Sequence, residues 1–333
     1  MKIALVITVK NEARLLRDNL LYHKAIGVSK AFVYFDGTTD DGRETIKCME
    51  DVVCNVSVDP KVYKHLDHLK KFTDYADAHH TARQCLNTYD ALQKCKAEGI
   101  DWLISIDADE LIVPHITDAQ QLTTFFETIP ASTDVVTFQV KELLQNQLNS
   151  KSIFAEAILF KSQPHFKRRI DKVYKRIYDP INNTYRHFNY WYGHAMGKSA
   201  IRVEAEIIPH NVHRYIYISG SKPQAFYKGY VLHYHSYDVD DFIKKFENFK
   251  HRPSTFLSGN SVEDLKLLWR DVVNHPDFSK EKLEAYYKEN VMFEMKTVKQ
   301  LIKNKHYFFI PRKEAAIESI TVVAHVFKTL RHQ

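Results

Sequence analysis

The stretch from Asp101 to Leu111 most constrains the fold, because it joins a buried strand to an acidic loop. Trp102 to Ile106 is a short apolar run of strand-forming residues, and Asp107, Asp109 and Glu110 follow it directly. In an open α/β sheet, ligands bind at the carboxyl ends of the strands, so we expect these carboxylates to face a ligand.

The spacing of Asp107 and Asp109 points both side chains the same way if the chain there is extended. Two adjacent carboxylates repel each other unless a cation lies between them. A divalent cation such as Mn²⁺ or Mg²⁺ takes oxygen ligands and suits this position. The alternative is a solvated acidic turn after a strand, since a lone Asp-x-Asp is a weak motif.

Residues 1 to 140 show strands and helices in alternation, which is typical of a Rossmann-like α/β unit. Ile3 to Val9 is a continuous apolar run, as expected for a central parallel strand. Asn11 is the predicted N-cap of the first helix, which ends at Gly27. The other expected elements are strands at 31–35, 52–58, 102–106 and 134–140 and helices ending near 49 and spanning 73–98 and 118–128.

The rest of the chain is less regular. We expect strands at 200–208 and 230–235, a helix at 238–249, and mostly helical structure over 261–330. The basic segment 166–176 is interpreted as a solvated surface element, with a phosphate-facing or acceptor-facing loop as the alternative.

Composition excludes several classes of protein. The chain has 333 residues but only 9 glycines, and it contains neither G-x-G-x-x-G nor a P-loop sequence, which counts against dehydrogenases and P-loop nucleotide hydrolases. The net charge of +6 suits phosphate-bearing substrates or an anionic membrane surface, but it is too small to indicate nucleic-acid binding. No apolar run is long enough to span a membrane. The four cysteines form no C-x-x-C pair and are interpreted as reduced thiols, so we expect a cytoplasmic protein.

Four pieces of sequence occur in a fixed order: Lys10–Glu12; Tyr22–Gly27 followed by Val33–Asp40; Arg83; and Asp101–Glu110. Together they resemble the family 2-type glycosyltransferases with the GT-A fold, and most nearly the subgroup allied to family 92. The resemblance continues through Gly197–Arg202, His213 and Leu232–Tyr234. It implies an α/β GT-A domain over residues 1–250, with a nucleotide-binding half to about 140 and an acceptor half over 141–250. Residues 251–333 would form a helical C-terminal extension.

The resemblance also implies roles for individual residues. Asp109 would bind the metal directly, and Asp107 would reach the ribose or the water shell of the metal. A histidine would complete the metal site, with His213 the first candidate, His233 the second and His235 a further one. The nucleotide-sugar would be bound by Asn11, Glu12, Asp36, Arg83, Asp107 and Lys198. An inverting enzyme also needs a carboxylate base, and Glu142, Asp171 and Asp238 are equivalent candidates.

The function that this resemblance implies is metal-dependent transfer of a sugar from a nucleotide-sugar. We expect a UDP-sugar, UDP-galactose for example, and a glycan or glycolipid acceptor in surface polysaccharide or lipopolysaccharide synthesis. One alternative is a sugar-phosphate nucleotidyltransferase, but such enzymes usually carry a Gly-rich loop where this chain has Lys10–Glu12. Another is a non-catalytic sugar-binding protein on the same fold.

The segment from Val291 to Gln333 mixes apolar and basic residues. It predicts either peripheral contact with an anionic membrane, at its inner face, or a packed helical cap.

Overall fold

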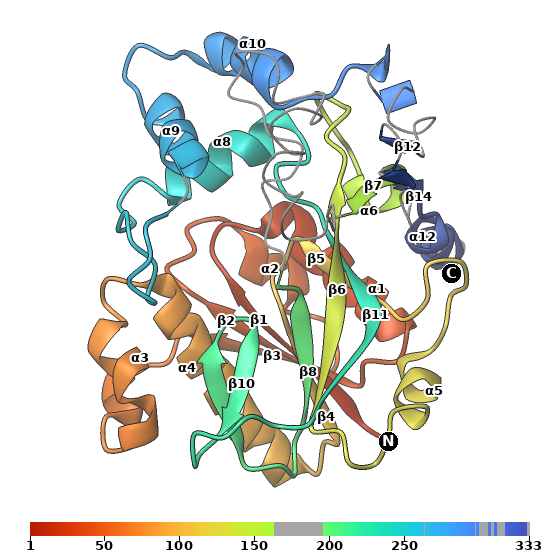
Figure 1. The fold of residues 1–333 in the computed structure, drawn as a ribbon. Helices are drawn as coiled ribbons and strands as arrows, with labels where there is room; N and C mark the ends of the chain where they lie inside the picture. Colours follow the sequence, from red (N-terminus) through yellow and green to blue (C-terminus); the bar gives the residue numbers. More distant parts are fainter. Residues whose placement is uncertain are drawn as a thin grey trace.

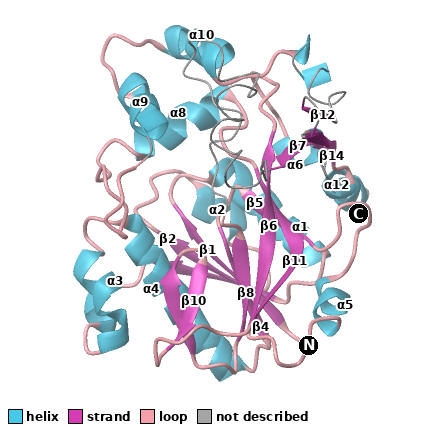
Figure 2. Cartoon of the chain, in the orientation of Figure 1, coloured by secondary structure: helices cyan, strands magenta, loops and turns pink. Residues whose placement is uncertain are grey.

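Strand β1 (Ile3–Val9) lies inside a mixed β-sheet. The structure is a computed structural model, and it describes residues 1–162, 196–262, 264–296, 298–299, 306–307, 310–311 and 317–331. The sheet runs in the order β14-β7-β6-β8-β4-β1-β2-β3 (Figures 1 and 2). Its parallel part comprises β1, β2 (Lys30–Phe35), β3 (Val52–Val56) and β4 (Trp102–Ile106). Beyond β4 the strands pair in antiparallel fashion: β8 (Lys198–Arg202), β6 (Val135–Leu143), β7 (Leu159–Ser162) and β14 (Ile317–Ser319).

Strand β11 (Ala225–His233) brings the second half of the chain to the acidic loop. It pairs in parallel with β6 and antiparallel with β5 (Glu110–Val113), which follows the loop directly. These registers place His233 opposite Glu142 on β6 and opposite Glu110 on β5.

The two faces of the sheet bury different sets of side chains, because residues alternate along each strand. On β1, Ile3, Leu5 and Ile7 belong to one apolar cluster, while Ala4 and Val6 belong to another. The larger cluster is covered by α1 (Ala13–Ala25), α5 (Leu122–Glu127), α6 (Ile153–Glu156) and α12 (Val322–Arg331), and the smaller one by α4 (His80–Glu98).

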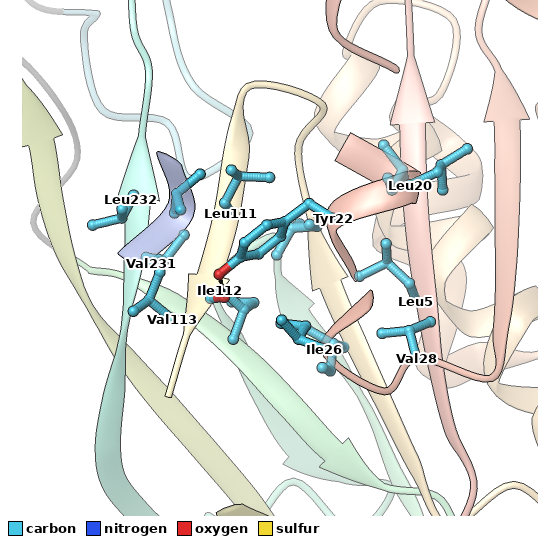
Figure 3. Packing of buried hydrophobic residues seen from close by; sticks show 14 of the residues in the cluster. Leu5, Leu20, Tyr22, Ile26, Val28, Leu111, Ile112, Val113, Val231 and Leu232 are labelled. Carbon is cyan, nitrogen blue, oxygen red and sulfur yellow. Dashed lines mark hydrogen bonds between the residues drawn. The ribbon is translucent and has the colours of Figure 1, made fainter. Parts of the chain in front are cut away.

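Tyr22 shows how α1 is fixed to the sheet. Figure 3 shows its ring among the apolar side chains of the larger cluster, and its hydroxyl donates to the carbonyl oxygen of Ile112 on β5 at 3.0 Å. Helix α1, which follows the first turn, and strand β5, which follows the acidic loop, therefore pack into the same core.

Helices α8 (Val239–Asn248), α9 (Asp264–Val273) and α10 (Lys280–Asn290) lie together at the top of Figure 1 and share an apolar cluster that includes Phe242 and Trp269. Helices α2 (Gly42–Ile46) and α3 (Lys70–Tyr75) are short. Strands β9 (Ile207–Asn211) and β10 (Arg214–Tyr217) form a separate hairpin. Two-residue strands at 306–307 and 310–311 pair with each other.

Several expected elements differ in the structure. The helix expected at 73–98 is two helices, α3 and α4, because the backbone is extended at His79. The strand expected at 200–208 is divided between β8 and β9 by a turn. Strand β5 was not predicted, because its four residues follow the acidic loop without a separating turn signal.

The described residues of the C-terminal part are mostly helical, as expected, but they also include short strands. Strand β14 adds to the edge of the main sheet through β7. The described part of the segment after Val291 includes α12, whose Phe327 stacks near Tyr22 and Phe154. No helix among the described residues is long and apolar enough to cross a bilayer. The basic segment 166–176 lies outside the described residues.

Candidate functional site

The acidic loop is a tight turn and not the extended chain that its spacing predicted. The amide of Glu110 donates to the carbonyl oxygen of Asp107 at 3.1 Å, and Glu110 Oε2 accepts from the amide of Asp107 at 2.9 Å. Glu110 is fully buried, and burial raises the pKa of its carboxyl group. It therefore shapes the turn through these two hydrogen bonds.

Asp107 is held by side chains from two other elements. Lys198 Nζ lies 2.7 Å from Asp107 Oδ2, and Gln84 Nε2 on α4 donates to Oδ1 at 2.5 Å. Burial alone would raise the pKa of Asp107, but the ammonium group of Lys198 lowers it to about 2. Lys198 is itself buried. Its Nζ also lies 3.3 Å from Glu110, so it forms ion pairs with both Asp107 and Glu110.

Asp109 has a different pair of partners. Its Oδ2 lies 2.9 Å from Lys245 Nζ on α8 and 3.3 Å from His233 Nε2 at the end of β11. Burial opposes ionisation of Asp109, but these two cations hold its pKa well below the usual range.

His233 connects Asp109 to a second carboxylate. Its Nδ1 lies 2.9 Å from Glu142 Oε1. Burial alone would lower the pKa of His233, but Glu142 and Asp109 raise it to about 10. Glu142, a candidate base from the sequence, therefore contacts the histidine beside Asp109 in the described structure.

The other candidate histidines lie differently. His213 sits in the β9–β10 hairpin, where its Nδ1 is 2.9 Å from the carbonyl oxygen of Gly197. The ring of His235 packs edge-on against that of His233 at 5.4 Å, and burial lowers its pKa well below the usual range. Among the described contacts, His233 is the histidine that reaches Asp109.

The described residues contain no ready cluster of three or more His, Cys, Asp or Glu side chains that would hold a metal ion. Asp109 and His233 nevertheless offer an oxygen and a nitrogen donor that converge, and Glu142 on the other ring nitrogen is the usual support of a metal-binding histidine. Lys245 contacts the same oxygen of Asp109 and would have to move aside. The described residues therefore offer two candidate donor side chains for a divalent cation.

Asp36 and Arg83 form a second, separate group at the carboxyl end of β2. The guanidinium of Arg83 donates from Nε and Nη2 to the two carboxylate oxygens of Asp36 at 2.6 and 2.9 Å, and from Nη1 to the carbonyl oxygen of Ala76. The sequence placed both residues in the nucleotide pocket. The structure brings them together, and four of the five N–H donors of Arg83 make hydrogen bonds.

Asn11 links the first turn to the loop after β2. It has a positive φ of 58°, and its side-chain oxygen accepts from the amide of Thr39 at 2.8 Å. It is not the N-cap that the sequence predicted, because Glu12 occupies that position and Asp40 accepts from the amide of Ala13 at 2.8 Å.

Glu12 faces α8. Lys244 Nζ bridges Glu12 and Asp241 at 2.7 and 2.8 Å. Burial raises the pKa of Glu12 to about 8, although Lys244 opposes this. Glu12 therefore contacts α8 in this structure.

The remaining base candidates are Asp238 and Asp171. Asp238 is buried, caps α8 by accepting from the amide of Asp241 at 2.9 Å, and pairs with Arg14 through both oxygens at 2.7 and 3.2 Å. These contacts indicate a structural role. Asp171 lies outside the described residues.

Two residues of the site were missing from the sequence-based roles, Gln84 and Lys245. Gln84 follows Arg83 on α4, but nothing in the sequence indicated that its side chain would reach Asp107. Lys245 lies on an amphipathic helix directly after the β11 strand, and a lysine there was visible but had no assigned partner.

Two proteins of Arabidopsis thaliana are similar to the chain. Glycosyltransferase-like At2g41451 is 28% identical over 207 residues, which is 59% of this chain and 45% of that protein. Glycosyltransferase-like At3g57200 is 27% identical over 207 residues, which is 59% of this chain and 39% of that protein. The chain thus spans less than half the length of these relatives.

Solved structures overlap it more weakly. Glucosyl-3-phosphoglycerate synthase from Mycobacterium tuberculosis, in complex with Mn²⁺, UDP and phosphoglyceric acid, is 12% identical over 61% of this chain and 56% of that one, with a TM-score of 0.27. TarS 1–349 of S. aureus in complex with UDP is 11% identical over 61% and 47%, with a TM-score of 0.31. At these scores the overlap carries no weight for donor, metal or acceptor.

The sequence pattern of a known family covers most of the chain. Glycosyltransferase family 92 matches residues 7–266, from the first strand of the sheet to the start of α9. The matched region contains the acidic turn, His233 and Lys245. The mixed sheet, with its parallel part β1–β4, agrees with the expected α/β GT-A fold. The chain belongs to glycosyltransferase family 92.

Proposed function

We propose that the protein is a metal-dependent glycosyltransferase that moves a sugar from a UDP-sugar to a hydroxyl group of a glycan or glycolipid acceptor. The observation that carries the proposal is the position of Asp109. It lies in the turn after β4, between Lys245 and a histidine that a second carboxylate supports. In an open α/β sheet this is the edge at which ligands bind.

Asp109 and His233 would hold a divalent cation, Mn²⁺ or Mg²⁺. When bound, such an ion stabilises the negative charge that develops on a departing diphosphate. Glu142 contacts Nδ1 of His233, so Nε2, on the side of Asp109, would be the ligand atom once it has released its proton.

Lysines supply further positive charge at the same place. Lys198 and Lys245 are buried or nearly so, and their ammonium groups lie on Asp107 and Asp109. Charges held in a site that excludes water act more strongly on a leaving group than charges in bulk water. If a cation took the place of Lys245 on Asp109, the ammonium group of Lys245 would be free to contact the leaving phosphate.

The nucleoside would lie along the ends of β1 and β2. Asp36, fixed by Arg83, offers carboxylate oxygens to the ribose or base, and Asn11 holds the loop after β2 against the first turn. The acceptor hydroxyl also requires a proton acceptor. Of the three candidates from the sequence, Glu142 contacts His233 and Asp238 contacts Arg14, while Asp171 lies outside the described residues.

Calorimetric titration of UDP with and without Mn²⁺ tests the proposal. We expect binding that requires the metal, together with slow metal-dependent hydrolysis of one member of a panel of nucleotide-sugars. Binding of UDP that ignores the metal, or no binding at all, would contradict the proposal. Turnover of a nucleoside triphosphate with a sugar phosphate would instead identify a nucleotidyltransferase, and metal-dependent binding without any turnover would identify a binding protein.

A further inference from the structure

Most cations around the acidic turn are paired with a carboxylate. The ion pairs are Lys198 with Asp107, Lys245 with Asp109, Lys244 with Glu12, Arg83 with Asp36, and Arg14 with Asp238. Arg252 differs from these five. Within the described part of the chain, its side-chain contacts are to a neutral ring nitrogen and to an aromatic face, and no carboxylate lies within ion-pair distance.

Two residues hold the guanidinium of Arg252 in place. It lies over the ring of Phe249 at 4.0 Å from the ring centroid, and Nη1 is 3.2 Å from Nε2 of His80. His80 is the first residue of α4, while Arg252 follows the end of α8. The side chain therefore bridges the two helices whose Gln84 and Lys245 contact the acidic turn.

The bond to His80 places Arg252 beside the proposed donor site, because His80 lies one turn of α4 before Gln84, whose side chain contacts Asp107. Burial lowers the pKa of Arg252 to about 10, and the charges that act on it are those of Asp36, Arg83 and Asp107. Burial and Arg252 also lower the pKa of His80 well below the usual range, so its Nε2 accepts the hydrogen bond. A guanidinium has five N–H donors, and the bond to His80 leaves most of them available.

We propose that Arg252 contacts the diphosphate of the nucleotide-sugar donor and that His80 is its positioning residue; this rests on the proposed function. A planar guanidinium matches phosphate oxygens through paired N–H donors. The family resemblance assigned Arg83 to nucleotide-sugar binding, but hydrogen bonds to Asp36, Ala76 and Asp77 use four of its five N–H donors. Arg252 has the charge and the unused donors for the diphosphate.

Comparing UDP with uridine in the presence of Mn²⁺ tests this inference. UDP affinity is measured by calorimetry and uridine affinity by NMR titration for the wild type and for Arg252→Gln. Because a hydrogen bond to a charged group contributes about 1.5–3 kcal/mol, the variant should bind UDP at least about tenfold more weakly. Its affinity for uridine should be unchanged.

Three further variants sharpen the test. Lys250→Gln removes an exposed charge from the same segment and should bind UDP like the wild type. Arg252→Lys keeps the charge but loses the paired donors, so UDP affinity should fall several-fold. His80→Ala should weaken UDP binding in the wild type and have no further effect in the Arg252→Gln background.

The outcomes separate the two proposals. If the wild type binds no UDP, the proposed function fails and the inference fails with it. If the wild type binds UDP and a folded Arg252→Gln variant binds it equally well, Arg252 does not contact the diphosphate and the proposed function stands. Should Arg252→Gln not fold, wild-type UDP affinity in Arg252→Lys overturns the inference.

Discussion

Nδ1 of His233 lies 2.9 Å from Oε1 of Glu142, on the side of the ring opposite the nitrogen that faces Asp109. The parallel register of β11 and β6 places these two residues opposite each other, so the pairing is built into the sheet. Glu142 is therefore positioned to orient the histidine.

Replacing Glu142 with Gln tests that role. Loss of such a supporting carboxylate typically costs about 10–100-fold in metal affinity or activity, so we expect Mn²⁺ to bind more weakly and turnover to recover at high Mn²⁺. Titrating activity against Mn²⁺ measures the effect. If Glu142 is instead the base, turnover will stay low at saturating metal while the affinity for the metal is unchanged.

The variant Asp109→Asn should lose the metal-dependent reaction. The substitution removes the ionised oxygen that Lys245 and His233 share, and we expect turnover of the nucleotide-sugar to fall by at least about 100-fold. Asp118→Asn is the matched control, because Asp118 is exposed and lies on a loop outside the site. Wild-type turnover in Asp109→Asn would refute the role assigned to this residue.

Asp238 offers a test by stability. Asp238→Ala removes the cap of α8 and leaves Arg14 without its carboxylate, so the free energy of unfolding should fall by about 2 kcal/mol. Asp238→Asn keeps a capping side chain and should lose less. Urea unfolding of both variants gives the comparison. Unchanged stability together with lost turnover would restore Asp238 as the base.

Gly197 precedes Lys198 and has a φ of +67°. A Cβ at this position would lie 1.9 Å from the carbonyl oxygen of Phe138, so Gly197→Ala must displace β8 or β6. Gly99 has a similar φ of +65° but nothing within 4 Å of an added Cβ. We expect Gly197→Ala to lower the free energy of unfolding by at least about 2 kcal/mol more than Gly99→Ala does. Equal effects in a denaturant titration would show that the backbone relaxes.

His23 should make stability depend on pH. It is buried on α1, with Nδ1 at 2.9 Å from Asn19 and Nε2 accepting from the amide of Ile112 at 3.2 Å, and burial lowers its pKa from 6.5 to about 4. The unfolded chain therefore binds the proton first as the pH falls below 6.5, and the folded state loses about 2 kcal/mol relative to pH 7.5 by pH 5. His23→Gln should remove this part of the pH dependence. If the free energy of unfolding changes equally in wild type and variant between pH 7.5 and 5, this role of His23 is contradicted.

Strands β1 and β4 were predictable because each is an apolar run that ends in a polar turn. Ile3–Val9 and Trp102–Ile106 match the structure at both ends. Strand β5 and strand β14 were missed because each has only a few residues and gains its strand conformation from a neighbour distant in sequence.

The candidate site shows the same division. Asp107 and Asp109 could be identified from the strand they follow. The choice of His233 over His213 could not, because it depends on the register of β11 against β5 and β6. Arg252 had no signal at all, since its position depends on packing against Phe249 and on the first residue of a helix that is remote in sequence.

Lys198 and Lys245 act as built-in counter-ions of the acidic turn. The polypeptide can therefore bring its aspartates together during synthesis without waiting for an ion from solution, unlike small domains that fold only around zinc. Under the proposed mechanism, a chelating buffer should abolish turnover while the protein stays folded, and adding the ion back should restore turnover without a refolding step.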